Sequence, residues 1–99
     1  MIYYINLNKF SDFDKETIIE KMINMGYEKS YLSDYSFCPY LIIHKDFEDH
    51  KTPVYENINK GFLIKLKSEM NIQEITDKDN FITAAFNLYK HNQYINKLF

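Results

Sequence analysis

One segment of the chain, residues 41–53, carries residue types that could do chemistry, and it reads LIIHKDFEDHKTP. In an extended strand, alternate side chains share one face. One face of this segment would then present two imidazoles and two carboxylates, from His44, Asp46, Glu48 and His50. Such a set suits zinc, manganese or iron, and it could also supply a general base with an orienting carboxylate.

The same segment also has the composition of the solvated end of a β-hairpin. The residues FEDHKTP are typical of a turn, and the i, i+2 spacing holds only while a strand continues. The alternation of polar residues with Ile43 and Phe47 indicates a strand with one wet face. We therefore expect no catalytic residue and no cofactor. A metal-binding module, or a small metal-dependent enzyme built on this face, is kept as an alternative.

The single cysteine, Cys38, is a second candidate, as a nucleophile served by His44 or His91. Its neighbours Phe37 and Pro39 are apolar, and apolar surroundings leave a thiol unreactive, so we expect Cys38 to be a packing residue. The sequence contains no glycine-rich phosphate loop, nucleophile elbow or zincin motif. These observations predict a protein that is not an enzyme.

The charge composition bears on nucleic-acid binding. All twelve basic residues are lysines, and fourteen acidic residues bring the formal net charge to −2. Arginine, which is absent, supplies the bidentate fork that recognises phosphates and guanine edges. The lysines alternate with acidic residues instead of forming the basic stripe that nucleic-acid-binding proteins usually display. We therefore expect no direct sequence-specific binding of nucleic acid.

Tyrosine is the most prominent candidate for binding a partner. Nine tyrosines and eight phenylalanines make up 17% of the chain, and several tyrosines fall where the predicted structure is least regular. Binding residues often lie in such segments, and tyrosine is enriched at protein interfaces. The alternative is that these rings cap the edge of the core with their hydroxyl groups in water. The predicted partner-binding residues are Tyr27, Tyr31, Tyr35, Tyr40, Asp46, Glu48 and Asp49.

The first part of the chain predicts a strand over Ile2–Leu7, followed by a helix over Phe13–Met25. Apolar residues recur along this helix with the spacing of one buried stripe. Ser11 is a favourable N-cap with Asp14 three residues later, and Gly26 is typical of the position that ends a helix.

The rest of the chain predicts three further strands and a second helix. The strands cover Pro39–Phe47, residues 54–58 and residues 62–68, the last from the alternation in FLIKLKS. The second helix is expected to have Thr76 as its N-cap and Asp79 in the capping-box position. The final residues either continue this helix or fold back.

The element order is therefore β-α-β-β-β-α, with a turn at Gly61. This order predicts an α+β fold in which an antiparallel sheet of three to four strands carries two helices on one face. A length of 99 residues indicates one domain, residues 1–99. No apolar run is long enough to cross a membrane, and the N-terminal strand lacks the basic flank of a signal peptide. Together with the lone cysteine, these features favour the cytoplasm.

The run QEITDKDNF resembles a segment, EIT-x-x-(D/E)-F, that opens the final helix of small accessory proteins encoded by bacteriophages of low-GC hosts. The matching residues are Glu74, Ile75, Thr76, Asp79 and, one position later than in that pattern, Phe81. Residues with AT-rich codons are abundant, as a low-GC genome requires. The resemblance implies a protein of the host cytoplasm that binds and inhibits or redirects a host protein, a class that includes anti-defence and anti-CRISPR inhibitors.

The expected function is therefore the binding of a host protein. A nucleic-acid-binding enzyme is one such partner, since the acidic positions of this chain would complement a basic groove. Two alternatives remain open. One is the metal site described above, and the other is a homo-oligomeric structural protein, such as a homodimer that pairs through an exposed sheet edge.

Overall fold

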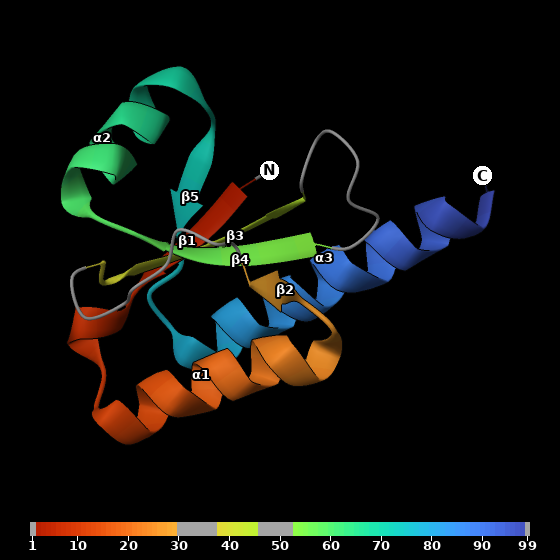
Figure 1. The fold of residues 1–99 in the computed structure, drawn as a ribbon, viewed down its shortest axis with the longest axis horizontal. Helices are drawn as coiled ribbons and strands as arrows, with labels where there is room; N and C mark the ends of the chain where they lie inside the picture. Colours follow the sequence, from red (N-terminus) through yellow and green to blue (C-terminus); the bar gives the residue numbers. More distant parts are fainter. Residues whose placement is uncertain (1, 30–37, 46–52, 99) are drawn as a thin grey trace.

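The computed structural model describes residues 2–29, 38–45 and 53–98, with the exception of the side chains of residues 45 and 92–98. The chain forms an α+β fold in which a sheet separates one helix, above it in Figure 1, from two helices below it. The elements are β1 (Ile2–Asn6), a 3-10 turn η1 (Leu7–Lys9), α1 (Asp12–Met25), β2 (Glu28–Lys29), β3 (Tyr40–Lys45), β4 (Pro53–Ile58), α2 (Lys60–Glu69), β5 (Ile72–Glu74) and α3 (Lys78–Leu98).

The sheet is mixed and has five strands in the order β2-β4-β3-β1-β5. β3 pairs antiparallel with β1 and β4, whereas β5 runs parallel to β1, and β2 runs parallel to β4. The predicted antiparallel sheet of three to four strands therefore holds for β1, β3 and β4, whereas the two parallel edge strands were not predicted. The two edge strands enter through helical connections, which bring the chain back in the same direction and so produce parallel pairs.

The helix α1 begins and ends where the local sequence predicts, within one residue. The Ser11 hydroxyl accepts a hydrogen bond of 3.2 Å from the backbone N–H of Asp14. Gly26 ends the helix in the left-handed conformation, with φ of +106°. Asp12 and Asp14 lie in the first turn, where their carboxylates interact favourably with the positive end of the helix dipole.

The segment that the alternation in FLIKLKS predicts to be a strand is instead the helix α2. The Asn59 side chain accepts a hydrogen bond of 2.8 Å from the backbone N–H of Phe62 and thereby caps the helix. Leu63 packs against the sheet and is 4% exposed. Gly61, which the sequence suggests as a turn residue, lies within this helix and has no positive φ. The fold therefore contains three helices in the described residues, one more than predicted.

The helix α3 is capped by Asp77 and not by Thr76 as predicted. The Asp77 carboxylate accepts a hydrogen bond of 2.9 Å from the backbone N–H of Asn80, and the Asp77 carbonyl accepts one from Phe81. An aspartate side chain accepts hydrogen bonds from the free N–H groups of a first turn as well as threonine does. Asp77 can therefore cap the helix in place of Thr76, one residue later. The helix continues to Leu98. In the described part of the chain, no helix is both long and apolar enough to cross a membrane.

The sheet is buried on both faces, which explains the apolar run in β3. Leu41, Ile42 and Ile43 are each no more than 1% exposed, so the single wet face expected for this strand is wrong over these residues. We call the two sides of the core the lower cluster, between the sheet and α1 and α3, and the upper cluster, between the sheet and α2. The lower cluster contains Ile5, Leu7, Ile18, Met22, Tyr27, Leu41, Ile43, Tyr55, Phe81 and Ala85. The upper cluster contains Ile2, Tyr4, Ile42, Ile58 and Leu63.

Candidate functional site

His44 lies near the end of β3 on the upper side of the sheet, where it meets a carboxylate that the sequence pattern did not single out. The register places Glu56 of β4 opposite Ile42, so Glu56 is a diagonal neighbour of His44 on the same face. His44 Nε2 lies 3.3 Å from Glu56 Oε1, and the two side chains are 19% and 16% exposed. The sequence could reveal this pair only once the pairing of β3 with β4 was known.

The predicted metal face is only partly within the described residues. His44 is described, whereas Asp46, Glu48 and His50 lie outside the described residues. Over residues 2–29, 38–45 and 53–98, no group of three or more His, Cys, Asp or Glu side chains is arranged to hold a metal ion.

Cys38 is too far from His44 to be activated by it. The two residues are six positions apart along a largely extended chain, which corresponds to roughly 20 Å at the rise of a β-strand. His91 lies on α3, and α3 is on the opposite side of the sheet from α2 (Figure 1). Cys38 is half-buried, and the packing role expected for it stays a prediction.

The predicted tyrosine surface is divided by the fold. Tyr31 and Tyr35, like Asp46, Glu48 and Asp49, lie outside the described residues. Tyr27 is 5% exposed and belongs to the lower cluster. Tyr40 is half-buried beside the upper cluster. Tyr27 therefore has a packing role in this chain, and only Tyr40 of the two lies near an open surface.

The Tyr27 hydroxyl is fully engaged within the core. It donates a hydrogen bond of 2.7 Å to the carbonyl oxygen of Ala85 on α3. Its ring lies 6.0 Å from that of Tyr89, also on α3. Burial raises the pKa of the Tyr27 hydroxyl above its usual value. The residue thus joins the end of α1 to the middle of α3 and stays neutral.

An aromatic contact on the upper side involves Tyr4, Tyr40 and Lys67. The two rings meet edge to face with centroids 6.1 Å apart, and Lys67 Nζ lies 5.0 Å from the centroid of the Tyr4 ring. A side-chain hydrogen bond with Tyr4 raises the pKa of Lys67. This contact fixes one flank of α2 on the sheet and keeps a cation beside it.

The other flank of α2 borders a pocket of about 170 Å³. Five apolar side chains line it, together with the pair His44 and Glu56; the apolar ones are Ile2, Ile42, Phe62, Leu66 and Met70. A second pocket of about 160 Å³ adjoins it, and the two share Glu56 and Phe62. The sequence did not indicate this site, because its alternating pattern predicts a strand over residues 62–68. The sequence around Glu56 also contains no motif that marks it as a binding residue.

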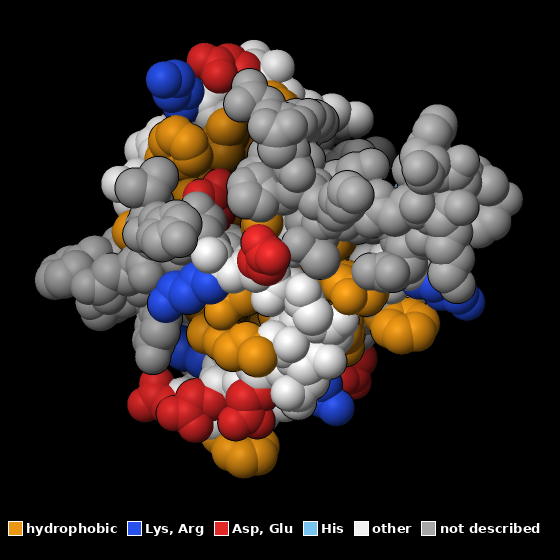
Figure 2. All heavy atoms as spheres, turned by 45° about the vertical axis from the view of Figure 1, so that its right-hand side comes forward, with side chains coloured by type: hydrophobic (Ala, Val, Ile, Leu, Met, Phe, Trp, Pro, Cys, Tyr) orange, Lys and Arg blue, Asp and Glu red, His pale blue; other side chains and the backbone are white. Residues whose placement is uncertain are grey.

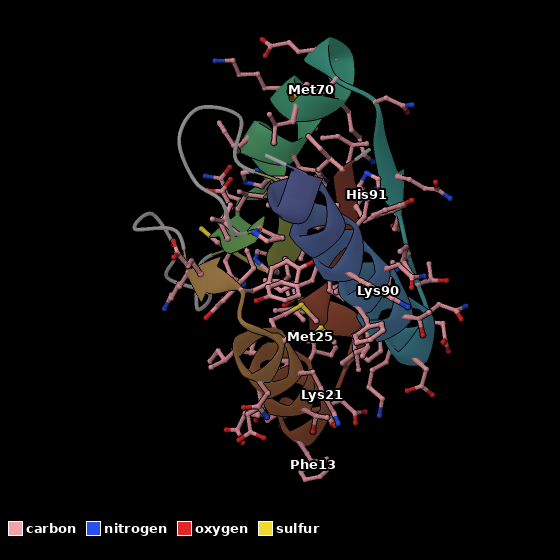
Figure 3. All side chains as sticks on the ribbon, turned by 90° about the vertical axis from the view of Figure 1, so that its right-hand side faces the viewer. Phe13, Lys21, Met25, Met70, Lys90 and His91 are labelled. Carbon is pink, nitrogen blue, oxygen red and sulfur yellow. The ribbon has the colours of Figure 1, made fainter. Side chains whose placement is uncertain are left out.

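Two of the side chains that line this pocket, Phe62 and Met70, are large, apolar and exposed. Six such residues are exposed in the described chain, and three of them lie on α2 or at its end: Phe62, Ile64 and Met70, at 42%, 59% and 39%. Figure 3 places Met70 beside α2, at the end of the molecule opposite Phe13. We call the exposed surface of residues 60–70 and the adjoining pocket the α2 surface.

Charge is unevenly distributed between α2 and α1. The helix α2 carries Lys60, Lys65 and Lys67 with a single acidic residue, Glu69. In contrast, α1 carries four acidic residues and two lysines, and acidic side chains gather at that end of the molecule (Figure 2). The helix α2 therefore carries more basic than acidic residues on a chain whose net charge is negative.

Comparison of the chain with family models, curated proteins and solved structures returned no match. Its function must therefore be inferred from the geometry, burial and charge of the surface and pocket described above.

Proposed function

We propose that this protein is a non-enzymatic binding protein that acts by covering part of a partner protein, and that the partner docks on the α2 surface. The observation that carries this proposal is the concentration of exposed apolar side chains there. Phe62 and Met70 line the same pocket, and Ile64, two residues after Phe62, is exposed on another side of the helix. Clustered apolar residues with a polar rim are typical of protein interaction sites.

The charges of α2 indicate which surface the partner offers. Lys60, Lys65 and Lys67 lie on the same helix as Phe62 and Ile64. Opposite charges across an interface speed association and select against wrong partners. An apolar patch with acidic residues around it is therefore the surface that fits α2.

The kind of partner that we propose, a host protein, is suggested by the resemblance to phage accessory proteins. The segment from Glu74 to Phe81 motivates a host protein as the target, bound so that its activity is blocked or redirected. The acidic positions Asp46, Glu48 and Asp49 remain candidates for a second contact with a basic region of the same partner.

The proposal is tested with two variants matched in residue type, element type and exposure. Ile64→Ser alters the α2 surface, and Ile23→Ser alters α1, where the isoleucine is 54% exposed. Each purified variant and the unmodified chain are used to capture proteins from a low-GC bacterial lysate. We expect one protein whose capture falls about tenfold or more with Ile64→Ser and is unchanged with Ile23→Ser, as loss of a well-packed contact predicts.

The captured protein is then purified and its binding measured by calorimetry at two salt concentrations. Binding through the lysines of α2 should weaken as salt rises. A partner that binds both variants equally, or that is lost only with Ile23→Ser, would place the interface elsewhere and refute the proposal.

A further inference from the structure

We draw no further inference here: the strongest candidate, the outer edge of the strand β5 (Ile72–Glu74), which pairs only with β1 among the described residues, is three residues long, and nothing in the structure shows what covers it.

Discussion

The hydroxyl group of Tyr27 is the buried side-chain donor that ties the end of α1 to α3, through its hydrogen bond of 2.7 Å to the Ala85 carbonyl. A phenylalanine at this position keeps the ring in the lower cluster and leaves the carbonyl without this donor. The size of the effect follows from the hydrogen bond alone, because the packing is retained.

We predict that Tyr27→Phe lowers the free energy of unfolding at pH 7 by about 1 kcal/mol, measured by urea denaturation. Tyr3→Phe is the matched control, since Tyr3 is half-buried against the same cluster and no side-chain hydrogen bond is formed by it among the described residues. Equal effects of the two substitutions would contradict the assignment of the hydrogen bond.

We also predict that the difference in stability between the unmodified protein and Tyr27→Phe depends on pH. Burial raises the folded-state pKa of Tyr27 above its ordinary value of 10.0, so stability from this group is present below pH 10 and lost as the pH rises. Above that point the unfolded chain loses the proton first, and the unmodified protein loses roughly 1.4 kcal/mol per pH unit relative to Tyr27→Phe. Their difference in stability should therefore shrink above pH 10 and reach zero before pH 11. A constant difference would show that Tyr27 is not protected from ionisation.

The two glycines illustrate opposite backbone requirements. Gly26 has φ of +106°, and a Cβ atom there would lie 2.5 Å from the Tyr89 hydroxyl oxygen. Gly61 lies in α2, and a Cβ atom there would meet only Asn59 Oδ1, at an ordinary 3.6 Å.

Gly26→Ala should therefore lower the stability by about 2 kcal/mol, because a left-handed conformation and a steric clash are both imposed on alanine. Gly61→Ala should raise it by about 0.5–1 kcal/mol, because alanine favours the helix. Thermal unfolding followed by circular dichroism measures both. A stabilising Gly26→Ala would contradict the close approach of Tyr89 to the end of α1.

At the scale of elements, α2 is the segment whose identity depends on its surroundings. As a strand, FLIKLKS would bury Ile64 together with Phe62 and expose Leu63. As a helix it buries Leu63, which is 4% exposed, and leaves Ile64 at 59%. Substitution of these two neighbouring residues therefore distinguishes the two structures.

We predict that Leu63→Ala lowers the free energy of unfolding by about 2–4 kcal/mol, as for other buried leucines. Ile64→Ala should change it by less than about 0.5 kcal/mol, as for an exposed position. Urea denaturation of both variants provides the comparison. The reverse order would favour the strand and remove the wall of the pocket that α2 forms.

At the scale of the whole molecule, the two clusters of the core share the strands between them. β1 and β3 contribute alternate residues to both, for example Ile42 to the upper cluster and Ile43 to the lower. If α2 detached, the upper face of β1 and β3 would be exposed to water. Because the lower face of the same strands packs against α1 and α3, the stability of each cluster depends on the other.

We therefore predict a single unfolding transition. Far-ultraviolet circular dichroism follows the helices, and near-ultraviolet circular dichroism follows tyrosines in both clusters. The two signals should share one midpoint, and Leu63→Ala and Ile18→Ala, one from each cluster, should shift both signals together. Separate midpoints in either variant would mean that α2 unfolds on its own.

The sequence by itself determined the features that depend on residues close along the chain. Ser11 and Asp14 begin α1 and Gly26 ends it, and each acts on backbone groups within one turn. The presence of α3, β3 and β4 was likewise readable from the sequence. The cap at Asp77, one residue from the prediction, shows the precision of such local signals, because several polar side chains near a helix start compete for the same N–H groups.

Only the tertiary structure decided which segments meet. The contact between His44 and Glu56 depends on the register of β3 with β4, and the parallel edge strands depend on where the helical connections return the chain. The same letters in FLIKLKS satisfy a period of two and a helical stripe, so the apolar surface of β1 and β3, which α2 covers, decides between them. The pocket forms where side chains from β1, β3, β4 and α2 meet. These residues are distant in sequence, so no local pattern predicts their contact.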